Sequence, residues 1–189
     1  MEAHTSIPPM RIAFLVEGMS SSGVDTSTKL LAAALRDLGN HVVIFSPWKE
    51  RSSGATDPEF ATLPPIKINA SQPTYLSVPV SWGVFERFRK EQFDLIHVHT
   101  STTVNLIAWQ MSSVLNIPII YTYHTMTVEY AHYLGPLISR FTPVVEPAIE
   151  LFDRMVCNRG DGIGARSRKA FDYLEHIAVR PKVTVIPNG

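Results

Sequence analysis

The chain has 189 residues, of which 45% are hydrophobic and 18% are charged, a profile typical of one globular domain with a sizeable core. Seventeen basic and seventeen acidic residues cancel, so no long-range field attracts the domain to nucleic acid or to an anionic membrane. The charge balance therefore argues against a nucleic-acid-binding protein.

The N-terminal segment, Met1 to Pro9, is polar and lacks the basic and apolar regions of a signal peptide. We interpret it as a disordered tail or a remnant of cloning. No apolar run approaches the roughly 20 residues that a membrane span needs, so a cytoplasmic location is the default expectation. The single cysteine, Cys157, excludes an internal disulfide and is expected to be a buried thiol.

The first predicted unit consists of a strand, a glycine-containing loop, a helix and a second strand. Arg11 to Val16 is a short apolar run that suits a buried parallel strand. A helix follows, with Thr26 or Ser27 placed to cap its start and Gly39 placed to end it. Its apolar residues recur at helical spacing and are Leu30, Leu31, Ala34, Leu35 and Leu38. His41 to Phe45 is the next strand and completes a βαβ unit.

The rest of the chain continues this alternation after one irregular excursion. Trp48 to Pro79 is rich in Pro, Ser and Thr and offers only short strands, near Ile66 to Ile68 and Tyr75 to Val78. A helix around Trp82, Phe85 and Phe88 is expected next. The later expected elements are a strand at Asp94–His99, a helix at Val104–Leu115, a strand at Ile119–Tyr123, a helix at Val144–Asn158 in a region broken by prolines, a strand at Gly162–Ala165, a helix at Arg168–Leu174 and a strand at Val183–Ile186. The alternation predicts a doubly wound, Rossmann-like parallel α/β sheet that binds ligands at the carboxyl ends of its strands.

Seven short motifs in order, across residues 10–189, give the chain a resemblance to a known family. They are MRIA at the first strand, SGV in the glycine loop, the Leu30–Gly39 helix and turn, DLIHVH at Asp94–His99, TYHT at Thr122–Thr125 (a T-x-H-T pattern), DGI followed by Ser167, and VIPNG at Val185–Gly189. Together they resemble the N-terminal, acceptor-side domain of family 4 glycosyltransferases, the retaining two-domain GT-B enzymes. The resemblance implies that a C-terminal nucleotide-sugar domain, absent from this chain, acts with residues 10–189.

Two further stretches are most similar to the diacylglycerol glucosyltransferase branch of that family. They are HTMTVEYAHYLG, which starts at His124, and the R-x-x-x-N-R-x-D pattern from Arg154 to Asp161. This similarity implies transfer of a hexose, with glucose foremost, from an NDP-sugar such as UDP-glucose to a lipid or a carbohydrate hydroxyl. It implies no metal and no cofactor besides that co-substrate. One departure is Ser22, which precedes Gly23 where the family more often has a second glycine.

The glycine loop and His124 are the two leading site candidates. Gly23 and Val24 lie between a strand and a helix, where backbone amides and the helix dipole favour a diphosphate; the alternative is an ordinary turn. His124 follows a strand at the ligand-bearing edge, and the resemblance implies a catalytic, reactant-positioning role. The alternative for His124 is a core histidine bonded to a neighbouring loop.

The remaining candidates are grouped by the ligand that they would contact. For the acceptor cleft they are His99, Thr125, Tyr130 and Tyr133, and for a phosphate contact they are Arg166 and Lys169. Arg166 and Lys169 fit a solvated helix start equally well. His97 and His99 have metal-ligand spacing, but no nearby carboxylate or thiol completes a set, so His97 is expected to pack in the sheet. The aromatic residues Trp82, Phe85 and Phe88 are interpreted as packing on the sheet, with a membrane-facing role as the alternative.

A second hypothesis for the function belongs to another class. A stand-alone Rossmann-like module could bind a small ligand or a partner without catalysis. If the enzyme hypothesis holds, this chain alone is expected to be inactive, because the donor-binding domain lies outside it.

Overall fold

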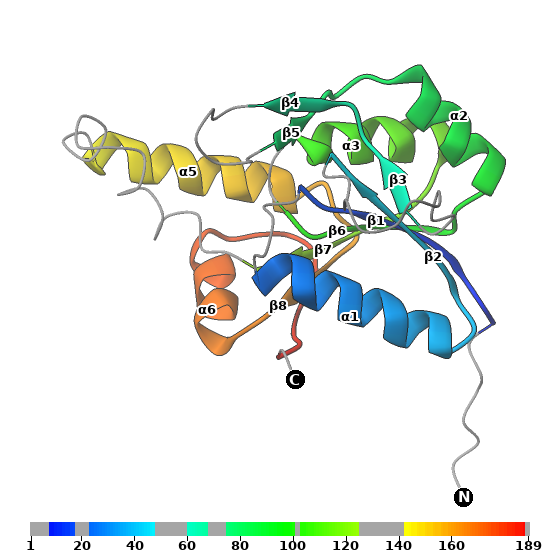
Figure 1. The fold of residues 1–189 in the computed structure, drawn as a ribbon. Coiled ribbons are helices and arrows are strands. Elements are labelled where there is room, and N and C mark those ends of the chain that lie inside the picture. Colours follow the sequence, from blue (N-terminus) through cyan, green and yellow to red (C-terminus); the bar gives the residue numbers. More distant parts are fainter. Residues whose placement is uncertain are drawn as a thin grey trace, which may run out of the picture.

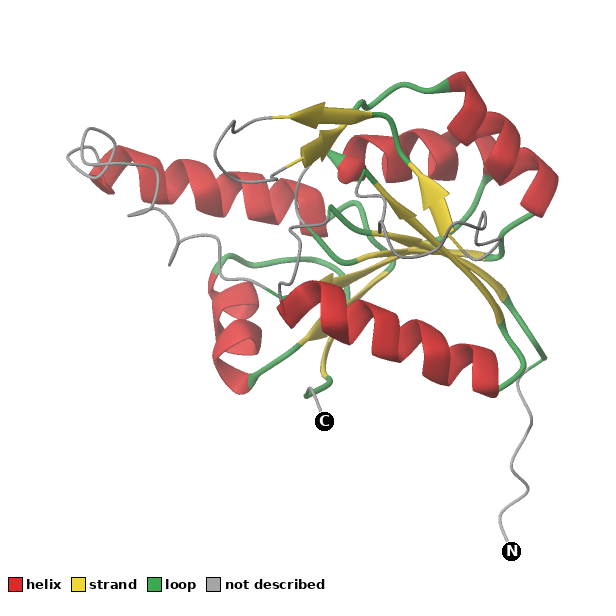
Figure 2. Cartoon of the chain, viewed as in Figure 1, coloured by secondary structure: helices red, strands yellow, loops and turns green. Residues whose placement is uncertain are grey.

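The computed structural model describes residues 8–17, 23–47, 60–67, 75–100, 103–124 and 142–187. Within these residues, seven parallel strands form one sheet in the order β3-β2-β1-β6-β7-β8-β9, and β4 pairs with β5 as a separate antiparallel hairpin. Figure 2 shows the strands side by side in the centre, with helices around them. The strand order reverses between β1 and β6, so the sheet is doubly wound as predicted.

The strands of the main sheet are short and largely apolar because the sheet is covered on both faces. Their bounds are β1 Arg11–Leu15, β2 His41–Ser46, β3 Phe60–Thr62, β6 Leu95–Val98, β7 Ile119–Tyr123, β8 Gly162–Ala165 and β9 Val183–Val185, with the hairpin formed by β4 Pro65–Lys67 and β5 Tyr75–Ser77. The third strand of the sheet, β3, was not predicted. Its three residues carry too little pattern, and it forms only because it pairs with Ile44 to Ser46 of β2.

Five described helices flank the sheet (Figure 1). Their bounds are α1 Gly23–Asp37, α2 Trp82–Glu91, α3 Val104–Leu115, α5 Thr142–Cys157 and α6 Arg168–His176. The smaller apolar cluster joins β1 and β2 to α1 through Phe14, Val42 and Ala32. The larger cluster, on the opposite face, contains residues of α2, α3, α5 and α6, including Phe88, Ile107 and Leu174. Cys157 is buried in it, which confirms the expected interior thiol.

Two helices differ from their predicted form. The helix α1 begins at Gly23, before the expected caps Thr26 and Ser27, and its apolar repeat is largely exposed, with Leu30 67% and Leu38 77% accessible. The residues of α1 that are buried are Thr28 and Ala32, because the small side chains let the helix lie close to the sheet. The helix α5 contains Pro147, as the predicted helix at Val144–Asn158 does, but it begins two residues earlier, at Thr142. Among the described helices, none has the length and apolar character that crossing a membrane requires.

Candidate functional site

Four polar side chains follow directly after the strands at the centre of the sheet. His99 follows β6, His124 follows β7 and Arg166 follows β8, each one residue beyond the strand. Glu17 lies two residues beyond β1. Because the strands are parallel, these residues gather at the carboxyl edge, where the sequence placed the ligand site. The N-terminal part of α1 reaches the same edge, since Arg166 NH1 lies 3.3 Å from Ser27 Oγ.

Arg166, His124 and His99 form a continuous hydrogen-bonded series. Arg166 NH1 donates to His124 Nδ1 across 2.7 Å, and His124 Nε2 lies 3.2 Å from His99 Nδ1. The structure therefore brings together two predicted classes of residue, the catalytic candidate His124 and the phosphate candidate Arg166. His124 is half-buried, neither a core residue nor fully open to solvent.

The imidazoles at this edge are held in their neutral form. Burial, the Arg166 guanidinium and His97 lower the pKa of His124 to about 3. Burial alone lowers the pKa of His97 to about 4, and burial with the neighbouring His97, His124 and Arg166 lowers that of His99 well below its usual value. An imidazolium at His124 is therefore disfavoured at neutral pH, because a charged ring would lose hydration and meet the arginine cation.

His99 does not line an open cleft, contrary to its predicted role. It is 1% exposed and lies behind His124, with its ring against Phe14 at 4.6 Å and against His97 at 4.1 Å. His97 packs in the sheet as expected and shares a hydrogen bond with Thr122 Oγ1 at 2.7 Å. The pair is thus part of the wall that supports His124.

The predicted diphosphate loop is represented by Gly23 and Val24, the first residues of α1. Apart from its chain neighbours and the backbone of α1, no described atom lies within 4 Å of the position that a Cβ of Gly23 would take. The N-terminus of a 15-residue helix carries partial positive charge and unpaired N–H groups. An anion could therefore approach the backbone here, beside Arg166.

The other predicted contacts fall at or beyond the limits of the described site. Thr125, Tyr130 and Tyr133 lie outside the described residues. Lys169 is exposed in the first turn of α6, where Ser167 Oγ caps the helix by accepting from Ala170 N at 3.1 Å. This geometry matches the solvated helix start that was the alternative to a phosphate contact.

Sequence reasoning missed Glu17, a buried carboxylate at the point where the strand order reverses. Glu17 Oε1 accepts from Ser77 N at 2.8 Å, Oε2 accepts from Thr103 N at 3.2 Å, and Thr103 Oγ1 makes a further short contact with the carboxylate. Its own N–H donates to Thr100 Oγ1 at 2.9 Å. A charged residue immediately after a buried strand was the signal that could have identified it.

Beneath His124, a second buried carboxylate joins three elements. Asp153 Oδ2 on α5 accepts from Tyr123 Oη at 2.6 Å and from Tyr173 Oη on α6 at 3.0 Å. The two tyrosine rings stack with their centroids 5.8 Å apart. Because Tyr123 is the last residue of β7, this network fixes the end of the strand that carries His124.

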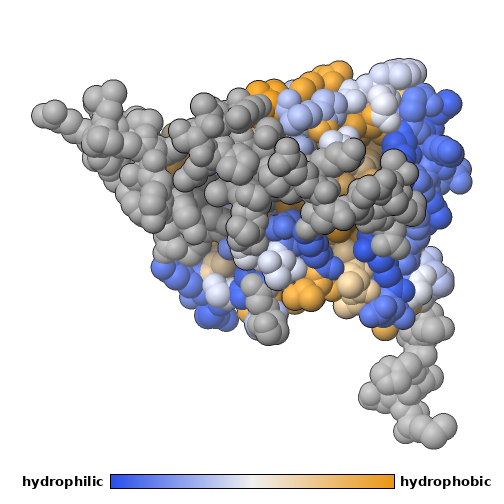
Figure 3. Space-filling view, viewed as in Figure 1, coloured by the Kyte–Doolittle hydropathy of each residue, from blue (hydrophilic) through white to orange (hydrophobic). Residues whose placement is uncertain are grey.

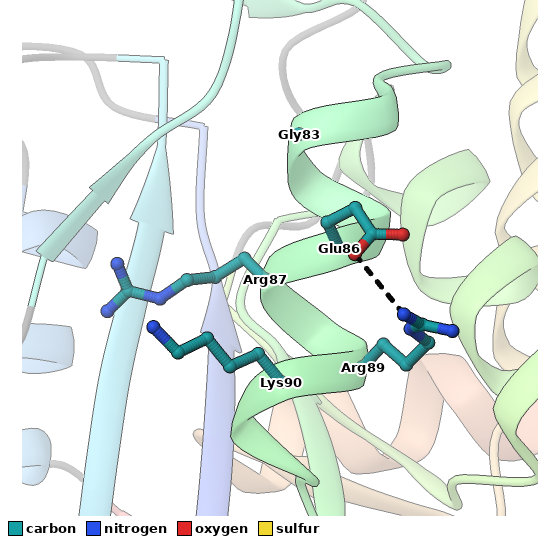
Figure 4. Close-up of a pocket in the computed structure, with 5 residues that line it drawn as sticks. All are labelled: Gly83, Glu86, Arg87, Arg89 and Lys90. Atoms are coloured by element: carbon teal, nitrogen blue, oxygen red, sulfur yellow. Dashed lines mark ion pairs between the residues drawn. The ribbon is translucent and has the colours of Figure 1, made fainter.

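A shallow hollow of about 660 Å³ lies elsewhere, on α2, and is lined by Gly83, Glu86, Arg87, Arg89 and Lys90. Figure 4 shows Arg87 and Lys90 extending to one side of the helix, while Glu86 and Arg89 pair on the other. Figure 3 shows hydrophilic side chains at the right of the view, where α2 lies. All residues that line the hollow belong to α2, and none lies at the carboxyl edge of the sheet, so the hollow is not part of the candidate site.

Metal ligation has no candidate in the part of the chain that the structure describes, where no three His, Cys, Asp or Glu side chains are grouped to hold an ion. The described edge instead offers hydrogen-bond donors: the guanidinium of Arg166 and the backbone N–H groups that begin α1. Such groups can bind and orient anionic or hydroxyl-bearing ligands.

Two curated proteins are similar in sequence to most of this chain. It is 26% identical over 171 residues to the alpha-monoglucosyldiacylglycerol synthase of Acholeplasma laidlawii, covering 89% of this chain and 43% of that protein. It is 27% identical over 168 residues to the enzyme of the same name from Streptococcus pneumoniae (strain ATCC BAA-255 / R6), covering 89% and 37%. The chain thus spans less than half the length of these relatives.

Solved structures show the same fold. The Anabaena protein HepE, solved with UDP and glucose, superposes with a TM-score of 0.61 at 16% identity, covering 95% of this chain and 44% of that one. A sucrose-phosphate synthase from Thermosynechococcus elongatus gives 0.60 at 16% identity, covering 95% and 89%. These similarities confirm a fold like that of GT-B glycosyltransferases. The model of Glycosyltransferase Family 4 matches residues 21–189, and the chain therefore belongs to this family, as its motifs predicted.

Proposed function

We propose that this chain is the acceptor-side domain of a retaining hexosyltransferase that transfers glucose from an NDP-sugar, UDP-glucose foremost, to the hydroxyl of diacylglycerol. The observation that carries the proposal is the joint placement of the α1 N-terminus, Arg166 and His124 at one edge of the sheet. Family membership and two relatives named as glucosyldiacylglycerol synthases support the reaction and the lipid acceptor. A soluble sugar is the second acceptor.

In this proposal the described residues act on the donor by electrostatics and positioning. The N–H groups at Gly23 and Val24 approach the diphosphate, and the helix dipole stabilises the negative charge that grows on it as the glycosidic bond breaks. His124 orients the reacting groups by hydrogen bonding. Basic groups of a separate nucleotide-sugar domain supply the remaining charge stabilisation. Thr125, Tyr130 and Tyr133 are retained as expected acceptor contacts.

The proposal includes that second domain as an intramolecular partner. Because the chain spans 43% and 37% of its curated relatives, their remaining length is available for a donor-binding domain. The 189-residue chain alone is accordingly expected to show no glycosyl transfer. No metal and no bound cofactor is required in this scheme.

A peripheral position at the cytoplasmic face of the membrane completes the proposal. Near the start of α2, Val80 is 70% and Trp82 74% exposed, with the Trp82 ring against Phe85 at 5.4 Å. Exposed tryptophan favours the interface between water and lipid. The basic residues of α2 could meet lipid phosphates, although Arg87 and Arg89 also pair with Glu91 and Glu86. Of the predicted aromatic stripe, Phe88 packs in the core and Trp82 does not.

The experiment uses the full-length protein with radiolabelled UDP-glucose, offered either diacylglycerol in vesicles or a soluble hexose. We expect label in a glucolipid with an α-linkage, and loss of most of that product in the His124→Ala variant. If label appeared only in the soluble hexose, the acceptor would be a soluble sugar and not diacylglycerol. Tight binding of UDP-glucose with no product from any acceptor would favour the non-catalytic module instead.

A further inference from the structure

The series that runs from Arg166 through His124 to His99 has only one arrangement of hydrogens. A guanidinium can donate but cannot accept a hydrogen bond. His124 Nδ1, 2.7 Å from Arg166 NH1, must therefore present its lone pair. Its single ring hydrogen is then on Nε2, which donates to His99 Nδ1 at 3.2 Å. His99 must in turn carry its hydrogen on Nε2.

Arg166 is placed in an unusual way for an arginine. Among the described residues, no carboxylate forms an ion pair with it, and its NH1 contacts are neutral: His124 Nδ1 and Ser27 Oγ. Its NH2 and the Nε2 of His99 are buried without a hydrogen-bond partner in the described part of the chain. A structural arginine would ordinarily be satisfied by an acid or by several carbonyls. The contact with His124 is thus its best-formed interaction.

We propose that Arg166 is a positioning residue that fixes His124 as the neutral tautomer with its hydrogen on Nε2. In this role Arg166 blocks Nδ1 as a proton acceptor, so that His124 serves the reaction as a hydrogen-bond donor and not as a general base. For His124 Nε2 to donate to a ligand hydroxyl, that hydroxyl has to replace His99 as the acceptor, and this bond of 3.2 Å is the longer of the two. The expected effect on catalysis rests on the proposed function, whereas the assignment of the tautomer does not depend on it.

The groups that face His124 from the described elements agree with a neutral ring. They are the Arg166 cation after β8 and the neutral imidazoles of His97 and His99 on β6 and after it. None supplies a negative charge that would favour an imidazolium. Removing Arg166 takes away one of the causes that lower the pKa of His124, while burial remains.

The test is two-bond ¹H–¹⁵N spectroscopy of the 189-residue chain with ¹⁵N-labelled histidine. The chain has seven histidines, so the His124 signals are assigned as those lost in His124→Gln. In the wild type we expect a neutral ring with hydrogen on Nε2 throughout the range of about pH 5 to 8. In Arg166→Leu we expect a mixture of tautomers and a pKa of His124 closer to the ordinary value of about 6.5.

Matched variants separate this role from a general effect of charge or folding. Arg168→Gln removes a neighbouring cation that pairs with Asp172 at 2.9 Å, and it should leave His124 unchanged. Arg166→Lys keeps a donor and should restore the Nε2–H tautomer even if Arg166→Leu does not fold. An unchanged tautomer and titration in folded Arg166→Leu, or a wild-type ring with hydrogen on Nδ1, would overturn the proposal.

The full-length enzyme provides the second readout. Arg166→Leu should lower kcat by roughly ten- to a hundredfold through mispositioning of His124, with partial rescue by Arg166→Lys and a new ionisation in the pH profile of kcat. A wild-type kcat and pH profile in Arg166→Leu would overturn the catalytic part. If His124→Ala is fully active, the role proposed for His124 in catalysis fails, whereas the spectra still decide whether Arg166 sets the tautomer.

Discussion

The carboxylate of Glu17 accepts a hydrogen bond from the backbone N–H of Ser77 across 2.8 Å, although the two residues are 60 positions apart. The same carboxylate accepts from Thr103 N at the start of α3. Glu17 thereby joins the end of β1, the end of β5 and the N-terminus of α3. These three points surround the place where the order of the strands reverses, so the contacts of Glu17 hold together the elements next to the candidate site.

Replacing Glu17 with alanine should lower the free energy of unfolding by about 1–3 kcal/mol, because the N–H of Thr103 loses its acceptor and the N–H of Ser77 keeps only Thr103 Oγ1. Chemical denaturation of the isolated chain measures this loss. Glu175→Ala, which removes an exposed carboxylate on α6, is the control and should be close to neutral. Equal stability of the two variants would show that the Glu17 contacts contribute nothing measurable.

The pH dependence of stability should also depend on Glu17. Burial raises its pKa above the ordinary value of 4.5, and hydrogen bonds from Thr103 and Ser77 oppose this effect. Because the folded state holds the proton to a higher pH than the unfolded state, stability falls as the pH rises from about 4.5 through the raised pKa. Glu17→Gln cannot titrate, so wild type should lose stability relative to this variant over that window. Parallel stability curves would contradict the direction of the shift.

Local pattern predicted the regular elements best. Val104–Leu115, Ile119–Tyr123 and Gly162–Ala165 have the predicted bounds, because each consists mainly of apolar or small residues and is ended by Asn, Pro or a polar turn. The buried face of α1 could not be predicted, because it depends on how close the helix lies to the sheet. The strand β3 depends entirely on its partner β2.

The site was predictable as a location but not as a set of contacts. Strand ends identified His124, and a family motif identified Gly23. The contact between Arg166 and His124 joins residues 42 positions apart, and that between Glu17 and Thr103 joins residues 86 apart. Such contacts depend on the order of strands in the sheet, which spacing along the chain does not encode.

Gly23→Val in the full-length protein should raise the KM for the donor by roughly tenfold while changing stability by less than about 0.5 kcal/mol. The φ angle of Gly23 is not positive and no described atom meets an added Cβ, so backbone strain is not expected. A branched side chain would instead obstruct approach of the diphosphate to the backbone amides. Gly23→Ala is the matched control with a smaller effect. A wild-type donor KM in Gly23→Val would make Gly23 an ordinary helix start.

Trp82→Ala should weaken binding of the protein to anionic vesicles by about tenfold, the loss expected for one large inserted side chain. Co-sedimentation measures the bound fraction at low and high salt. Because the chain carries no net charge, salt should have the smaller effect. Leu38→Ala removes a side chain that is 77% exposed just after the end of α1 and should not change binding. If the protein bound vesicles at low salt but not at high salt, the membrane contact would be assigned to the basic residues of α2.

His124→Ala tests the central residue of the site, and its contacts in the structure predict an effect on stability as well as on activity. A free surface histidine could be removed without loss of stability. His124 is bonded on both sides, to Arg166 and to His99. Truncation therefore leaves the buried imidazole of His99 without its described partner, and leaves the Arg166 guanidinium with Ser27 Oγ as its remaining described contact. We therefore expect a decrease of about 1–3 kcal/mol in the free energy of unfolding.

The decisive quantity is kcat per folded molecule of the full-length enzyme. If His124 positions the reacting groups, its loss should lower kcat by about 10²–10⁴-fold, or roughly 3–5 kcal/mol of transition-state stabilisation, well beyond the loss of stability. Because the pKa of His124 is lowered to about 3, the wild-type rate should show no ionisation of this residue between about pH 5 and 8. His124→Gln, whose amide can still donate a hydrogen bond, should recover part of the rate, since positioning needs a donor and not a base. Full activity of a destabilised His124→Ala would instead make His124 a residue that only supports the sheet edge.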